Sequence, residues 1–385
     1  MSIYELAILG CISPEDRKTL THTIHSMVSE FGLALGTELI IHDGVSFSER
    51  NIKAATAVAY FGGNQDLDHE PASDAITNSL PIIPTIAGGQ DFLTLIPEFL
   101  HQCNGLYRRA DDPGMVDLAT SLLECVGLLR RQRRIFISYR RTESRIAALD
   151  LHDSLIARGF DVFLDTHDIR PGEPFQEVLW HRLCDSDVLV MLDTPNYFES
   201  KWTRNELGRA RAKEIHIFRI LWPGHVSNRQ LNLSETIQLV PNDLMHGSIV
   251  PAKADEIALG IERLRSRSIA ARFMSMTGRF RSAVEQVGGT VQGVGAHRAI
   301  SVVLEAGERI WAYPITGIPT AETLHDIAEK ARRADVRGVP VLVYDDVGIR
   351  DTWVAHLKWL DDNIRTVRSI KMNRAAWDLG GWEEK

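Results

Sequence analysis

The stretch RRQRRIFISYRR, residues 130–141, decides the fold. Charged residues flank a short apolar run from Ile135 to Ser138, which is typical of a strand buried on both faces of a parallel sheet. Further elements are expected in alternation: helix 145–158, strand 161–165, helix 175–184, strand 187–192, helix 202–213 and strand 215–222. This alternation predicts a doubly wound parallel sheet of the α/β class.

Residues 1–130 predict a preceding α/β domain. Ser13 and Pro14 are suited to cap and begin a helix over 14–31. The remaining expected elements are the strands ELAILG, TELIIHD, TAVAYFGG and LPIIPTIAGG and helices over 91–103 and 115–131. Their order echoes that of the segment that begins at 133, so the first domain is interpreted as a possible degenerate copy of the second.

The chain beyond the central segment divides into a helix and a third, small α/β domain over 290–385. The helix is expected over 253–284 and is rich in arginine, which suits either a solvated connector between domains or a surface for phosphate or a partner. The small domain is expected to contain strands over 298–306, 309–315, 339–346 and 368–372 and helices over 320–335 and 351–365. Its role stays open.

Composition favours a soluble, cytoplasmic protein. Hydrophobic residues make up 44% and charged residues 24% of the 385, as in globular domains, and the net charge of -8 argues against a general nucleic-acid-binding surface. No stretch approaches the ~18 apolar residues of a membrane span, and no basic leader precedes the first strand. The four cysteines are widely separated, which fits a reducing compartment. His22 and His25 lack further ligands nearby, so no metal site is expected.

Polar and aromatic side chains gather in the loops expected at the carboxyl ends of the central strands, where doubly wound sheets bind ligands. Arginines there can hold a diphosphate, and aromatic rings can stack on a flat base. Offset by four on one helix, Trp202 and Glu206 share a face. The loops together supply Arg140, Arg141, Asp165, Asp168, Arg170, Tyr197, Trp202 and Glu206.

Three stretches in order resemble a TIR domain over about residues 133–225: RRIFISYRR, DTHDIRPGEPF and NYFESKWTRNELGRA. The Pro-Gly turn of DIRPGEPF and the S-x-W-x-x-x-E-L spacing carry the likeness. The sequence departs from the family at Thr203, where many members have cysteine, and at Asp193, where many have serine. The resemblance implies a flavodoxin-like sheet.

Catalytic TIR domains cleave the bond between nicotinamide and ribose in NAD+, and Glu206 aligns with their catalytic carboxylate. The resemblance therefore implies NAD+ as substrate, no further cofactor, and ADP-ribose or a cyclic ADP-ribose as product. Trp202 would form one wall of the pocket, or it would pack in the core as an anchor. Glu206 could instead be an acidic residue in the first turn of its helix, where the helix dipole favours a negative charge. Ser138, Tyr139, Arg140, Arg141, Asp165 and Tyr197 would line the pocket, although strand flanking or packing would also explain several of them.

TIR domains commonly act after assembling with one another, often in antiphage defence, so the resemblance implies a homo-oligomer or filament. The contact loop would be 165–175, with Asp168, Ile169, Arg170, Pro171, Gly172 and Phe175, although a solvated turn is the simpler reading of its charges. Two alternatives stay open. One is a non-catalytic TIR scaffold, and the other is an enzyme similar to nucleoside deoxyribosyltransferases, which share the sheet and a glutamate-based chemistry.

Overall fold

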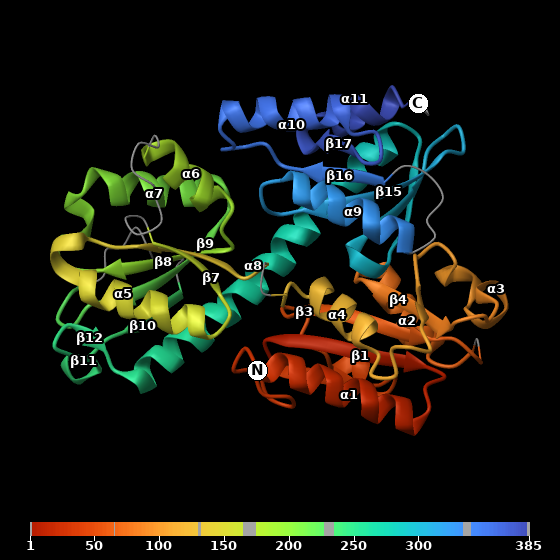
Figure 1. The fold of residues 1–385 in the computed structure, drawn as a ribbon, viewed down its shortest axis with the longest axis horizontal. Helices are drawn as coiled ribbons and strands as arrows, with labels where there is room; N and C mark the ends of the chain where they lie inside the picture. Colours follow the sequence, from red (N-terminus) through yellow and green to blue (C-terminus); the bar gives the residue numbers. More distant parts are fainter. Residues whose placement is uncertain are drawn as a thin grey trace. The chain divides into compact units, whose positions relative to one another are not determined.

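The computed structural model describes residues 2–64, 66–129, 132–164, 175–226, 235–333 and 340–382, without the side chains of 175–177 and 201–202. The chain forms two compact units (Figure 1). One unit contains residues 130–269 and 347–351, and the other contains residues 1–129, 270–346 and 352–385. The N- and C-terminal segments thus belong to one unit, while the segment boundaries drawn from the sequence stay a prediction.

The unit built around residues 130–269 contains a parallel sheet in the order β7-β6-β8-β9-β10. The first strand in the chain has the second place in the sheet, which is the flavodoxin-like order and confirms the predicted fold class. The short polar strand β10 was not predicted. The strands are β6 (Arg134–Ser138), β7 (Asp161–Leu164), β8 (Val188–Asp193), β9 (His216–Leu221) and β10 (Glu235–Gln238).

Helices cover both faces of this sheet, which explains why its strands read as continuous apolar runs. Alternate residues point to opposite faces, so Ile135 and Ile137 pack with α5 and the start of α8, whereas Phe136 packs with α6 and α7. The bounds are α5 (Arg141–Ala157), α6 (Phe175–Cys184), η4 (Tyr197–Glu199), α7 (Lys201–Ala212), η6 (Pro241–Asp243), β11 (Leu244–Met245), β12 (Ser248–Ile249) and α8 (Pro251–Gln286).

A network of buried charges fixes α8 to the amino-terminal edge of the sheet. Glu262 accepts hydrogen bonds from Arg265 at 2.8 Å and from Arg133, the residue before β6, at 3.0 Å. Arg265 also lies 3.5 Å from Asp187, the residue before β8. None of these four side chains is more than 2% exposed. The start of the predicted 253–284 helix therefore carries interior charges as well as solvated arginines.

The other unit begins with a second parallel sheet, whose order β2-β1-β3-β4-β5 repeats that of the central sheet. Ser13 caps α1 and Pro14 begins it, as predicted. The single helix expected over 91–103 is wrong, because Pro97 separates two short helices. The bounds are β1 (Tyr4–Gly10), α1 (Pro14–Ser29), β2 (Leu39–His42), η1 (Ser46–Glu49), β3 (Ala55–Phe61), α2 (His69–Thr77), β4 (Ile82–Ala87), α3 (Phe92–Leu95), η2 (Glu98–Leu100), β5 (Leu106–Arg108) and α4 (Val116–Cys125).

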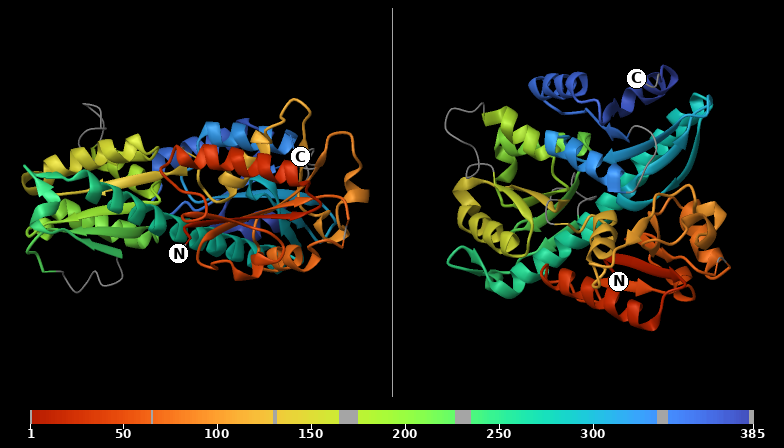
Figure 2. Two further views of the ribbon diagram at one scale, coloured as in Figure 1. Left: turned by 90° about the horizontal axis from the view of Figure 1, so that it is seen from below. Right: turned by 45° about the vertical axis from the view of Figure 1, so that its right-hand side comes forward.

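The same unit continues with a mixed sheet, whose strands have the cyan to blue colours in Figure 2. Its order is β13-β14-β15-β16-β17, and β15, β16 and β17 run parallel. Its elements are β13 (Thr290–Val294), η7 (Ala296–Arg298), β14 (Ile300–Val303), β15 (Arg309–Ile315), α9 (Ala321–Arg333), β16 (Pro340–Tyr344), α10 (Asp351–Asn363), β17 (Arg368–Lys371), η8 (Met372–Arg374) and α11 (Ala375–Gly380).

A buried carboxylate links the two sheets of this unit. Glu124 of α4 accepts a 2.6 Å hydrogen bond from His297 of η7 and is also bonded by Lys330 of α9. Burial acts to raise the pKa of Glu124, but the hydrogen bond from His297 and the charges of both partners outweigh it and hold the pKa at about 2. Within the described part of the chain, no helix is long and apolar enough to cross a membrane.

Candidate active site

The candidate site lies at the carboxyl edge of the central sheet, where β6 ends at Ser138 and β8 ends at Asp193. Ser138 is paired in register with Met191, so Ser138, Met191 and Asp193 all point to the face that α6 and α7 cover. The parallel strands thus present a hydroxyl and a carboxyl on the same face of the sheet. This is the edge at which doubly wound sheets bind ligands.

Glu206 of α7 reaches this edge from the helix side. Its side chain is turned to the sheet, and only 3% of the residue is exposed. The Ser138 hydroxyl donates a short hydrogen bond to Oε2 of Glu206. A serine at the last position of a strand thereby orients the carboxylate that the sequence singled out.

Tyr197 completes a hydrogen-bonded chain with these two residues. Its hydroxyl lies 2.5 Å from Ser138 Oγ. Because Ser138 has one hydroxyl proton and donates it to Glu206, its oxygen accepts the proton of Tyr197. The phenol, the hydroxyl and the carboxylate therefore form a directed chain, and all three residues are buried.

Thr203 fixes the entry into α7. Thr203 donates from Oγ1 to the carbonyl of Tyr197 at 2.6 Å and lies 3.1 Å from the carbonyl of Ser200. The Tyr197 ring is packed edge-on against Phe198, with ring centroids 5.2 Å apart. These contacts bind the turn that carries Tyr197 to the helix that carries Glu206.

Other predicted site residues lie apart from this chain of hydrogen bonds. Tyr139 follows Ser138, and its ring packs in the core on the opposite face, with α5 and α8. Arg140 binds the carbonyl of Asn196 at 2.5 Å and the carboxylate of Glu199 at 2.9 Å. Arg141 begins α5 and is exposed.

Several predicted residues lie outside what the structure describes. These are Asp165, Asp168, Ile169, Arg170, Pro171 and Gly172, which precede α6. The backbone of Phe175 begins α6, and that of Trp202 lies in the first turn of α7, but neither side chain is among those described. The pairing of Trp202 with Glu206 stays a prediction.

A second polar cluster lies at the same edge, and of its residues only Asp193 was noted in the sequence, as a departure that could alter the polarity of the pocket. Asp193 is fully buried, 3.4 Å from His225 Nε2 and 3.9 Å from Arg219 Nη1. Burial raises the pKa of Asp193 although the nearby His225 and Arg219 act to lower it. An arginine inside the apolar strand IHIFRILW was the available signal, since such a charge needs a partner.

Comparison with known proteins identifies the class of this unit. A family model described as TIR domain matches residues 135–248, so this chain contains a TIR domain, as predicted. The match extends past residue 225 because β10, β11 and β12 continue the domain. The chain is 23% identical over 93 residues to the 2' cyclic ADP-D-ribose synthase BtTIR of Bacteroides thetaiotaomicron. That alignment covers 24% of this chain and 32% of the relative, so the likeness spans about a third of that protein.

Proposed function

We propose that the TIR domain cleaves the nicotinamide–ribose bond of NAD+, with Glu206 as the catalytic carboxylate. The observation that carries this proposal is the position of the Glu206 side chain. It is buried between α7 and the sheet and accepts a hydrogen bond from Ser138 at the carboxyl end of β6. Burying a carboxylate is costly, and this one lies at the edge of the sheet where doubly wound folds bind ligands.

One carboxylate is sufficient for this reaction. Nicotinamide departs from NAD+ as a neutral ring, so no acid needs to protonate it, whereas most glycosidases need two carboxyl groups. Glu206 would stabilise the positive charge that develops on the ribosyl carbon. The donors Ser138 and Tyr197 would hold the carboxylate in one orientation.

The product depends on which nucleophile attacks the ribosyl carbon. Water gives ADP-ribose, and an internal hydroxyl gives a cyclic ADP-ribose. The name of the Bacteroides relative specifies a 2' cyclic product, which supports testing both outcomes. No further cofactor is proposed, since NAD+ is the substrate.

Activity is proposed to require assembly of TIR domains. Glu206 is 3% exposed, so the site would have to open before substrate could reach it. Contacts through residues 165–175 of neighbouring copies would favour the open arrangement and leave the free chain idle. A role in defence signalling is proposed on the same basis.

The proposal is tested by incubating NAD+ with the full chain over a range of protein concentrations and separating the products by chromatography. The wild type should release nicotinamide, with a rate per chain that rises with concentration. Glu206→Gln keeps the side-chain size and an oxygen to accept from Ser138, and it should lower the rate at least ~10³-fold while leaving assembly intact.

The control is Glu256→Gln, an exposed carboxylate on α8 that should leave the rate unchanged. If the assembled wild type never consumes NAD+, the chain is a scaffold. If it cleaves nucleosides but not NAD+, it belongs with the deoxyribosyltransferase-like enzymes. Equal rates for the wild type and Glu206→Gln would overturn the assignment of Glu206.

A further inference from the structure

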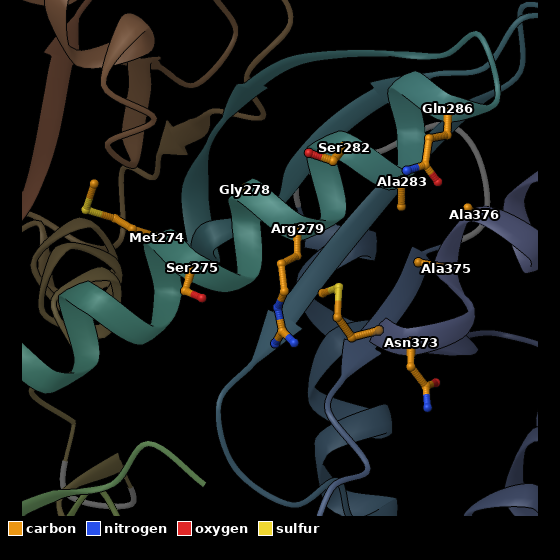
Figure 3. A pocket seen from close by; sticks show the side chains of 11 residues that line it. Met274, Ser275, Gly278, Arg279, Ser282, Ala283, Gln286, Asn373, Ala375 and Ala376 are labelled. Atoms are coloured by element: carbon orange, nitrogen blue, oxygen red, sulfur yellow. The ribbon is translucent and has the colours of Figure 1, made fainter. Parts of the chain in front are cut away.

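A pocket of about 530 Å³ lies in the unit that contains the mixed sheet (Figure 3). One wall is the 274–286 part of α8, and the other is η8 with the start of α11. We call it the α8 pocket. Its volume is within the range of small-molecule sites.

One wall of the α8 pocket begins at the end of a strand of the mixed sheet. Strands β16 and β17 are parallel neighbours, and η8 begins directly after β17 at Met372. Two wall residues, Met372 and Asn373, therefore follow the carboxyl end of β17.

The lining of the α8 pocket favours an organic anion. Arg279 is the charged side chain among the lining residues, and the other polar groups are hydroxyls and amides from Ser275, Ser282, Gln286 and Asn373. Alanine and methionine side chains supply the rest of the wall. A positive group with neutral donors beside an apolar wall suits a negatively charged head on an apolar or planar body.

The guanidinium of Arg279 retains capacity for a ligand. Its side chain is 53% exposed, and Nη2 lies 3.4 Å from Asp345, at the long limit of a hydrogen bond. Five donors in a planar fork leave others to bind phosphate bidentately. Figure 3 shows Arg279 projecting from α8 beside Asn373.

Carboxylates after β16 orient these two wall residues. Asp345 lies against Arg279, and Asp346 accepts from the Asn373 amide at 3.3 Å and from Lys371 at 3.0 Å. Gly278 faces the pocket with free space, since a Cβ there would meet nothing within 4 Å. Arg279 and Asn373 are thus held in place by these carboxylates, while the space in front of Gly278 is open.

We propose that the α8 pocket binds a phosphate monoester of nucleotide size, with the phosphate on Arg279 and the ring body along the alanine and methionine wall. This site is separate from the candidate active site and does not depend on the proposed NAD+ reaction. The phosphate and the ring body would both contribute to the binding free energy. Neither inorganic phosphate nor the nucleoside alone should therefore bind as tightly as the whole phosphate monoester.

The test is calorimetric titration of the full chain with AMP, with adenosine, with inorganic phosphate and with ribose 5-phosphate. We expect AMP to bind at least about tenfold more tightly than adenosine or inorganic phosphate. Ribose 5-phosphate distinguishes a sugar phosphate ligand from a nucleotide, because it lacks the ring that the apolar wall would contact.

Two variants tie binding to the α8 pocket. Arg279→Gln should weaken AMP binding at least about tenfold. Gly278→Leu should abolish it by filling the space, and the chain should still fold because leucine favours helix over glycine. Arg263→Gln, an exposed arginine elsewhere on α8, is the matched control and should change nothing. The proposal is overturned if no ligand binds at millimolar concentration, if inorganic phosphate binds as tightly as AMP, or if AMP binding survives Gly278→Leu.

Discussion

The buried charge network under the TIR sheet gives the sharpest test of how this unit is stabilised. In Glu262→Gln the side chain keeps its size but loses its charge. Arg133 and Arg265 both lose the charge of this partner, while Arg265 still lies 3.5 Å from Asp187. Because each of these side chains is at most 2% exposed, water cannot replace the lost partner.

The expected loss is about 3–5 kcal/mol, the usual cost of removing one partner from a buried ion pair. A surface comparison is Arg267→Gln, whose side chain is 46% exposed and pairs with Glu235. That change should cost less than about 1 kcal/mol. Each variant removes one charge from an ion pair, so the difference between their losses of stability measures the effect of burying the pair.

Hydrogen exchange measured on peptides that cover β6 and β8 is the suitable assay, because it follows this unit separately from the other. In Glu262→Gln these amides should exchange about a hundredfold to several-thousandfold faster, which corresponds to about 3–5 kcal/mol at 1.4 kcal/mol per factor of ten. In Arg267→Gln the change should stay below about sixfold.

The double variant Glu262→Gln/Arg265→Gln restores charge balance and should recover part of the loss, since Arg133 and Asp187 remain as one positive and one negative group. Neighbouring sites in one network are expected to be non-additive. Fully additive effects, or a Glu262→Gln exchange rate close to that of the wild type, would refute the reasoning.

Two further predictions concern the pH dependence and the packing of α8. Glu124 has a pKa of about 2, lowered from 4.5, so its contribution of up to about 3 kcal/mol should be present above pH 4.5 and lost as the pH falls toward 2. Hydrogen exchange of β15 peptides should show this loss, and Glu124→Gln should lack it. A Cβ at Gly260 would meet the Phe218 ring at 2.7 Å, so Gly260→Ala should destabilise by about 1–3 kcal/mol, whereas Gly278→Ala has space and should stabilise α8 by about 0.5–1 kcal/mol. Urea unfolding of both variants checks the opposite signs.

Sequence pattern was sufficient for strands β6 to β9 of the central sheet, because these strands are buried on both faces and differ sharply from their polar and charged flanks. Strand β10, with sequence ETIQ, gave no such contrast, since an edge strand can carry polar residues. The helix expected over 91–103 failed at Pro97, which ends one short helix before the next begins.

The candidate site was only partly accessible to sequence reasoning. The sequence put Ser138 at the end of a strand, Tyr197 in a loop and Glu206 on the helix that follows, and the structure brings the three together. The predicted site also included Tyr139, but alternation along a strand turns adjacent residues to opposite faces. The cluster around Asp193 depends on the pairing of β8 with β9, and a register between distant segments cannot be derived from local pattern.

The identical order of the two parallel sheets affects how this chain can be dissected. In each sheet the first strand lies inside, flanked by the second and third, so neither sheet can be completed without a crossover connection on both sides. A truncation that removes an inner strand such as β1 or β6 would leave two fragments of sheet with newly exposed, unpaired edges. Expression boundaries should therefore not fall inside a sheet, because such a cut would produce a chain prone to aggregate.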